Sequence, residues 1–364
     1  MRRVCSLVSP FVNHDSIAKT GRNLVDILYR MNANFTTFDI SNYFDSIPTK
    51  KDKKLIKTLN KTAISELSNE KNIVFNADLE MMRQYEFKYD YIPYFSLDTN
   101  AIPKEYINIL KDKESIFVYN NFTKNILQEC ALQSNIVVIP PSINSRIYKN
   151  PTAFGINGKC PFAFLSIVDV EKDLNWIDVV RSFYASFKLE DEVCLVIKAN
   201  TKYYSKYYQE SIAREIYFEK QKYQKSLPPI ILISVPLSDE EMASLYSECN
   251  CYVKISGVNS GLSFIEAFAS GLVCIGPEQG GCKEILNSKT GFMVKRSGEK
   301  RIFNETLSDG IIYNTYSEEH LSEIMRWVFD NSTNLKEKTV KERKIVLSRF
   351  DCNVVGQSFL KSLR

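Results

Sequence analysis

Two glycine-containing loops stand before two predicted helices in the stretch 251–284. The first loop, 256–261, follows an apolar run that predicts a strand, and it precedes a predicted helix that carries Glu266. The second loop contains Gly280 and Gly281. The first N–H groups of a helix lack partners within the helix and lie at the positive end of its dipole, so such loops can bind phosphate. The same glycines also suit ordinary tight turns, and the pattern by itself leaves both interpretations open.

The order of these segments resembles the nucleotide-sugar site of retaining GT-B glycosyltransferases of family 4. The resemblance rests on the runs Glu266-Ala-Phe-Ala-Ser-Gly-Leu-Val-Cys-Ile, Gly280-Gly-Cys-Lys-Glu284 and Gly291-Phe-Met-Val294. Members of that family usually carry two glutamates with seven residues between them. Glu266 matches the second glutamate, and Val258 stands at the position of the first. Because valine cannot act as a carboxylate, this position departs from the family pattern.

The resemblance implies that the second half of the chain binds the donor. On that basis Glu266 holds the ribose hydroxyls, since a carboxylate can accept both hydrogen bonds. The turn at Gly280 and Gly281 belongs to the same site. Backbone N–H groups near three further residues are implied to hold the diphosphate, namely Ser260, Gly261 and Leu262.

Two lysines are candidates for neutralising the charge of a diphosphate leaving group. Relatives place an arginine and a lysine in the first loop of this domain, where the present sequence offers Lys172 alone. Lys198, at the end of the next predicted strand, matches a lysine of some relatives. For both residues the alternative is a solvated lysine at the end of a strand.

Polar residues also follow two predicted strands in the first half of the chain. A strand over Val4–Val8 leads into a loop with His14, and a strand over Ile73–Phe75 leads to Asp78 and Glu80. Open α/β sheets bind ligands at the carboxyl ends of their strands. The resemblance therefore makes these three polar residues the catalytic candidates on the acceptor side, and surface positions are the alternative.

Composition indicates a globular chain with room for two cores: 364 residues, of which 44% are hydrophobic and 25% charged. A net charge of +4 permits an anionic ligand or a membrane surface and is no nucleic-acid signature. Nine cysteines without CxxC pairs, and two histidines, give no zinc pattern and predict reduced, buried thiols. No signal peptide and no apolar run of ~20 residues is present, which predicts a cytoplasmic protein, with contact at the inner face of the membrane left open.

The predicted fold is α/β and, by the resemblance, GT-B, with two Rossmann-like domains whose parallel sheets face a cleft. Residues 1–155 form the acceptor-side domain, and residues 156–345 form the nucleotide-sugar-binding domain. Residues 346–364 are a terminal helix that returns to the first domain. A polar stretch with glycine and proline, 149–158, marks the linker. The apolar run 229–234 predicts a strand covered on both faces.

One segment, 199–226, interleaves lysines with tyrosines. Such a pattern can bind nucleic acid or a membrane interface through phosphate contacts and amphipathic rings. It is also the pattern of a charged helix that buries its tyrosines.

The function implied by the resemblance is retaining transfer of a sugar from a nucleoside-diphosphate sugar to a saccharide or lipid-linked acceptor, as in glycan biosynthesis. The leaving phosphate itself then takes the acceptor's proton. The donor is a substrate, and neither a cofactor nor a metal is expected. One alternative is a GT-B binding or scaffold protein that has lost catalysis, which Val258 and the missing arginine favour. Another is a DNA-modifying sugar transferase, for which the lysine and tyrosine segment is the only support.

Overall fold

The computed structural model describes residues 4–13, 15–41, 72–85, 87–169, 173, 175–200, 206–255, 260–288, 290–304 and 307–364. Contacts divide the chain into two compact units. The first comprises Met1–Asn144, Glu299–Tyr313 and Arg349–Arg364, and the second comprises Ser145–Gly298 and Asn314–Ser348. The domain limits predicted from the sequence, 155/156 and 345/346, stay predictions.

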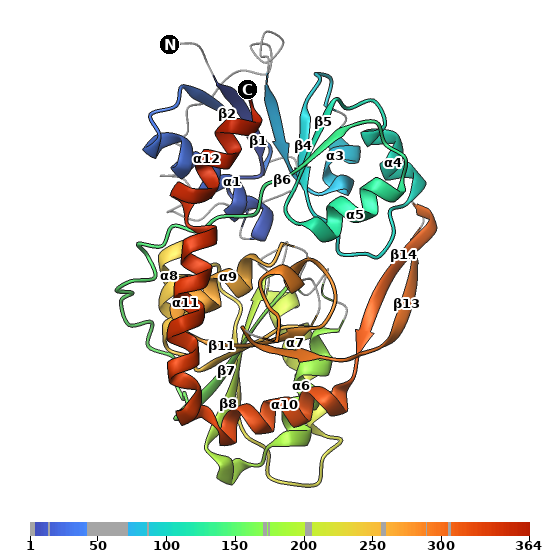
Figure 1. The fold of residues 1–364 in the computed structure, drawn as a ribbon. Coiled ribbons are helices and arrows are strands. Elements are labelled where there is room, and N and C mark those ends of the chain that lie inside the picture. Colours follow the sequence, from blue (N-terminus) through green and yellow to red (C-terminus); the bar gives the residue numbers. More distant parts are fainter. Residues whose placement is uncertain are drawn as a thin grey trace. The chain divides into compact units, whose positions relative to one another are not determined.

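The first unit is built on a parallel sheet of order β2-β1-β3-β4-β5-β6 in the part of the chain that the structure describes (Figure 1). Its strands are short and apolar, as a sheet covered on both faces requires. They are β1 (Cys5–Ser9), β2 (Phe35–Asp39), β3 (Ile73–Asn76), β4 (Ile92–Phe95), β5 (Ser115–Val118) and β6 (Asn135–Val138).

Helices cover both faces of this sheet because successive strand residues point to opposite sides. Leu7 packs with α1 (Ser16–Arg30) and α12 (Cys352–Ser362), whereas the next residue, Val8, belongs to the opposite core. That second core is completed by α3 (Leu79–Tyr85), α4 (Lys104–Leu110) and α5 (Asn121–Glu129). The terminal helix α12 lies so close to α1 that a Cβ on Gly356 would come 2.5 Å from Ile27 Cγ2.

The second unit repeats the plan with a parallel sheet of order β12-β11-β10-β7-β8-β9 in its described residues (Figure 1). The longest pair is β7 with β8, joined in register from Phe162–Val193 to Asp169–Asn200. The strands are β7 (Phe162–Asp169), β8 (Val193–Asn200), β9 (Ile230–Ile233), β10 (Cys251–Val253), β11 (Val273–Pro277) and β12 (Phe292–Val294).

Two sets of helices cover this sheet. One core includes side chains of α6 (Trp176–Ser186), α7 (Lys206–Lys220) and α10 (Glu318–Asp330). Elsewhere in the unit, Tyr246 of α8 (Asp239–Ser247) and Phe264 of α9 (Leu262–Ser270) contact the ring of Tyr252 in β10. Ser238 caps α8 in a capping box, with Glu241 as its partner. The chain then continues through α11 (Lys336–Phe350).

Three features of the second half differ from the sequence-based expectations. Strand β9 is the last strand on its side of the sheet, so all four of its residues are half-buried rather than covered on both faces. The second glycine turn leads into a helix of only four residues, the 3₁₀ helix η4 (Gly281–Glu284). This helix ends early because the Thr290 hydroxyl donates to the carbonyl of Ile285 and a turn follows. The hairpin β13 (Arg296–Asn304) and β14 (Leu307–Tyr316) was not foreseen.

The cysteines agree with expectation, since none of the nine forms a disulfide and seven are buried. All nine lie in the described residues. No helix among the residues that the structure describes is both long and apolar enough to cross a membrane.

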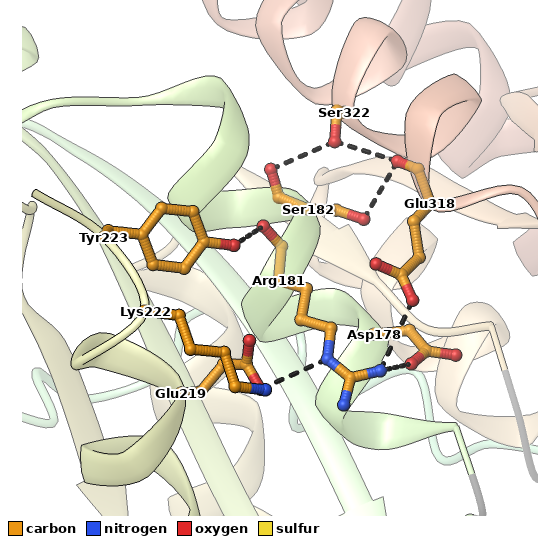
Figure 2. A network of polar contacts seen from close by, with 8 residues as sticks. All are labelled: Asp178, Arg181, Ser182, Glu219, Lys222, Tyr223, Glu318 and Ser322. Carbon is orange, nitrogen blue, oxygen red and sulfur yellow. Dashed lines mark hydrogen bonds and ion pairs between the residues drawn. The ribbon is translucent and has the colours of Figure 1, made fainter.

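A polar network joins three helices of the second unit around Arg181 (Figure 2). Its guanidinium contacts Asp178 on α6 at 3.0 Å, Glu219 on α7 at 3.2 Å and Glu318 on α10 at 3.4 Å. Lys222 pairs with the Glu219 carboxylate at 2.7 Å. Three carboxylates therefore share one guanidinium and one amine. Burial, followed by the charge of Glu318, raises the pKa of Asp178 to about 6.

We expect Asp178→Asn to gain stability relative to the wild type as pH rises. The folded pKa of Asp178 lies above the ordinary value of about 4, so the folded state binds more protons between about pH 4 and pH 6 and loses this advantage as pH increases. The melting temperature of the variant minus that of the wild type should be higher at pH 7 than at pH 4.5 by roughly 2–4 °C. A shift in the opposite direction would contradict the buried, charge-crowded position of Asp178.

Candidate functional site

Gly261, in the described end of the first glycine loop, packs against η4 and the residue after it, which follow the second glycine turn. Gly261 begins α9 in the left-handed conformation, with φ 66°. A Cβ at this position would collide with the Ile285 side chain and lie 3.6 Å from the Cα of Cys282 in η4. The backbone angle therefore favours glycine, and any larger residue must also displace the end of the Ile285 side chain. The structure thus brings the predicted residues at 260–262 and 280–281 to one place.

Hydrogen bonds order both turns. The Ser260 hydroxyl accepts the N–H of Leu262 at 3.2 Å, and the Gly261 carbonyl accepts the N–H groups of Phe264 and Ile265. Gly280 has φ 102° and ψ −177°, a combination that is essentially restricted to glycine. These turns follow β10 and β11 and so lie at the carboxyl edge of the sheet, where α/β folds bind ligands.

Glu266, one turn into α9, is buried with 4% of its surface exposed. Its Oε1 accepts the Tyr148 hydroxyl at 2.8 Å, and its Oε2 lies 3.2 Å from the Tyr246 hydroxyl. The carboxylate predicted to hold ribose is therefore already oriented by two buried tyrosines. Neither tyrosine was identified from the sequence.

Lys198 is a buried amine near the carboxyl end of β8, with 2% of its surface exposed. Its Nζ donates to the Ala199 carbonyl at 2.9 Å and to Asn200 Oδ1 at 2.7 Å, which are both uncharged oxygens. Within the described part of the chain, no carboxylate lies in ion-pair range of this amine. Burial lowers the pKa of Lys198 to about 8. Such a site favours an anion that would stabilise the ammonium form.

Lys254 is a second buried amine at this edge, and the sequence analysis assigned it no role. It follows β10 directly, and its Nζ contacts Asp173 Oδ2 at 2.8 Å and the Ile167 carbonyl at 3.0 Å. The same carboxylate oxygen accepts the N–H of Asp169 at 2.8 Å, so Asp173 links Lys254 to the end of β7. The available signal was a lysine inside an apolar strand pattern, since a buried charge requires a partner.

The acceptor-side candidates in the first unit are engaged locally. Asp78 Oδ1 accepts the N–H of Met81 at 2.7 Å and thereby caps α3. Glu80 pairs with Arg83 and also accepts from Gln84 and the Tyr106 hydroxyl. The hydrogen bond from Arg83 is the main reason why the pKa of Glu80 lies below its usual value.

Three residues named in the sequence analysis, His14, Lys172 and Val258, lie outside the described residues. Their roles stay predictions.

No protein-family model matches the chain, and no curated protein matches it. Solved structures do. Anabaena HepE in complex with UDP and glucose has a TM-score of 0.70 at 10% identity, covering 99% of this chain and 98% of HepE. A Rickettsia africae glycosyltransferase has a TM-score of 0.63 at 13% identity, covering 100% and 98%. A UDP-forming α,α-trehalose-phosphate synthase of Burkholderia xenovorans has a TM-score of 0.64 at 11% identity, covering 100% and 99%.

These matches establish the fold. The chain has the GT-B fold, with the two six-stranded parallel sheets described above, and the matched structures include a glycosyltransferase. The α/β fold with two parallel sheets that the sequence predicts is therefore confirmed. At 10–13% identity the similarity does not extend to activity, which has to be argued from the residues of the site.

We expect Gly261→Ala to destabilise the protein more than Gly271→Ala. Both glycines have positive φ, 66° and 84°, so alanine pays about 1–2 kcal/mol of backbone strain at either position. Beside Gly271 there is open space, whereas alanine at 261 must displace Ile285. The free energy of unfolding, measured with urea, should therefore fall by about 1 kcal/mol or more further in Gly261→Ala than in Gly271→Ala. Equal losses would show that Ile285 moves aside freely and that the two loops are not tightly packed.

Proposed function

We propose that this chain is a retaining glycosyltransferase that moves a sugar from a nucleoside-diphosphate donor to a saccharide or lipid-linked acceptor, in the manner of family 4. The second unit binds the donor through the turns at 260–262 and 280–281, with Glu266 at the ribose. The leaving phosphate takes the acceptor's proton. The reaction needs no metal ion, because lysine and backbone N–H groups meet the charge of the diphosphate.

The observation that carries this proposal is the buried amine of Lys198. It lies at the edge of the sheet where both glycine turns lie, and its described partners are uncharged oxygens. When a glycosyl bond breaks, negative charge develops on the departing diphosphate. A preorganised ammonium in a site shielded from water stabilises that charge far better than a solvated one. The pattern thus suits a donor whose leaving group is an anion.

Structural neighbours indicate which donor to test first. HepE was solved with UDP-glucose, and other matched structures contain UDP. Uridine diphosphate is accordingly the first probe. On the acceptor side, His14, Asp78 and Glu80 remain the candidates for contacts to a hydroxyl group. Since Glu80 is held by Arg83, we assign it to orienting the acceptor and not to removing a proton.

The test is a thermal-shift screen of UDP, GDP, ADP and the corresponding nucleotide sugars, run in parallel with EDTA and with added manganese. We expect one nucleoside diphosphate to raise the melting temperature, since a ligand that binds only the folded state stabilises it. Slow release of that nucleotide from its labelled sugar, or transfer to an added acceptor, establishes catalysis. Binding without any turnover would favour the catalytically inactive alternative. Stabilisation that requires manganese would contradict metal independence.

Lys198 gives the donor site a pH signature. With a pKa of about 8, about three quarters of the amine is neutral at pH 8.5, and a bound diphosphate should restore the ammonium form. Nucleotide binding at pH 8.5 should therefore take up most of one proton, and binding at pH 6.5 should take up none at this residue. Calorimetry in two buffers of different ionisation enthalpy measures the uptake.

Lys198→Met is the matched variant for this experiment. Replacing a buried charge by an apolar side chain of similar length is compatible with a stable fold, so the melting temperature should hold. The variant should lose the proton uptake at pH 8.5 and bind more weakly. If the variant and the wild type took up equal numbers of protons, Lys198 would not face the diphosphate.

A further inference from the structure

Two tyrosines from different segments bind the carboxylate of Glu266. Tyr246 belongs to α8, the helix immediately before β10. Tyr148 comes from much earlier in the chain, in the turn region that precedes β7, and lies 118 residues from Glu266 in sequence. Both rings are buried, with 0% and 3% of their surfaces exposed. The carboxylate is therefore held from two directions by the fold of the second unit.

The two bonds are unequal. Tyr148 donates to Glu266 Oε1 at 2.8 Å, the ordinary distance for a hydroxyl donor. The Tyr246 hydroxyl lies 3.2 Å from Glu266 Oε2 and 3.2 Å from the carbonyl of Ser263, and its single proton cannot serve both. Burial, followed by the Glu266 charge, raises the pKa of each tyrosine well above its usual value, so both hydroxyls keep their protons.

Tyr148 is itself anchored by α11. The Arg343 guanidinium donates to the Tyr148 carbonyl at 2.8 Å. A chain of polar contacts thus runs from Arg343 through Tyr148 to Glu266, and all of these residues belong to the second unit. Because the Tyr148 ring is buried, water cannot replace a hydrogen bond that is lost at its hydroxyl. The direction of the carboxylate depends on where this segment is held.

We propose that Tyr148 is a positioning residue that orients Glu266 for a ribose diol, so that the site discriminates ribonucleotides from 2′-deoxyribonucleotides. The inference rests on the proposed function, in which Glu266 meets the ribose. A carboxylate can accept about four hydrogen bonds, so bonds from tyrosines and bonds from a diol are compatible on one carboxylate. A vicinal diol needs acceptors in fixed directions, and a carboxylate that rotates loses that match.

The experiment measures affinities by calorimetry for UDP and 2′-deoxy-UDP, or for the nucleoside diphosphate that binds and its 2′-deoxy form. The quantity of interest is their ratio, which a general loss of packing does not change. We expect the wild type to prefer the ribonucleotide by about tenfold or more, the value of one hydrogen bond to a charged group. Glu266→Gln should remove most of this preference.

Tyr148→Phe keeps the ring and deletes the hydroxyl. It should reduce the preference about fivefold while changing the affinity for the deoxynucleotide less than twofold. In the background of Glu266→Gln, the same substitution should change the ratio no further. Tyr246→Phe is the matched control, because its hydroxyl is shared with the Ser263 carbonyl, and its effect on the ratio should be smaller.

Arg343→Gln provides a second route if Tyr148→Phe does not fold. It releases the Tyr148 carbonyl without touching the ring, and the preference should fall about two- to threefold. An unchanged ratio in the folded variants of Tyr148 and Arg343, with the preference lost in Glu266→Gln, would overturn the inference and leave the proposed function intact. Tighter ribonucleotide binding by Tyr148→Phe would also overturn it, since the hydroxyl would then compete with the ligand. If the wild type binds no nucleoside diphosphate, the proposed function itself fails.

Discussion

A buried ion pair between Lys254 and Asp173 lies at the carboxyl edge of the sheet in the second unit, and the structure of this edge depends on it. Lys254 stands at the end of β10 with 9% of its side chain exposed, and Asp173 is exposed by 1%. An isolated ion in such surroundings would cost several kcal/mol, and removal of one partner leaves the other uncompensated. The pair therefore ties Asp173, which lies between β7 and α6 in the sequence, to Lys254 after β10, and Asp173 also accepts the N–H of Asp169. In this way it joins the carboxyl ends of β7 and β10.

The buried charge of Lys198 is compensated more weakly than that of Lys254. Its amine is as deeply buried, but a carbonyl and an amide oxygen take the place of the carboxylate in the part of the chain that the structure describes. The lowered pKa of Lys198 expresses that incomplete compensation. The two amines differ in this respect. Lys254 neutralises Asp173, whereas the ammonium form of Lys198 would be stabilised further by an added anion. An anionic ligand close to Lys198 would supply the negative charge that its described partners lack.

Local patterns made the fold predictable, and long-range partners limited what could be predicted of the site. Apolar runs predicted strands such as β1, β3 and β9, since this signal is local, whereas β2 and β4 were not predicted. Gly261 was recognisable from its place before a helix. By contrast, the carboxylate partner of Lys254 lies 81 residues away, and Tyr148, one of the partners of Glu266, lies 118 residues away. The hairpin β13–β14 lacks a strong apolar pattern and was missed for that reason.

The departure at Val258 bears on whether this site turns over a donor or only binds one. A protein that merely kept the fold would be more stable with an apolar side chain at position 198, because replacing buried ions by well-packed apolar groups is often neutral or stabilising. A buried amine without a described carboxylate is instead the kind of local cost that accompanies a ligand site. Glu266, held by Tyr148, is likewise ordered before any ligand binds. Preorganised charge of this kind lowers a reaction barrier because it requires no rearrangement as the transition state forms. Under the proposed function, Lys198 and Glu266 would both be preorganised for the donor, although one carboxylate of the pattern in the resembling family is replaced by valine.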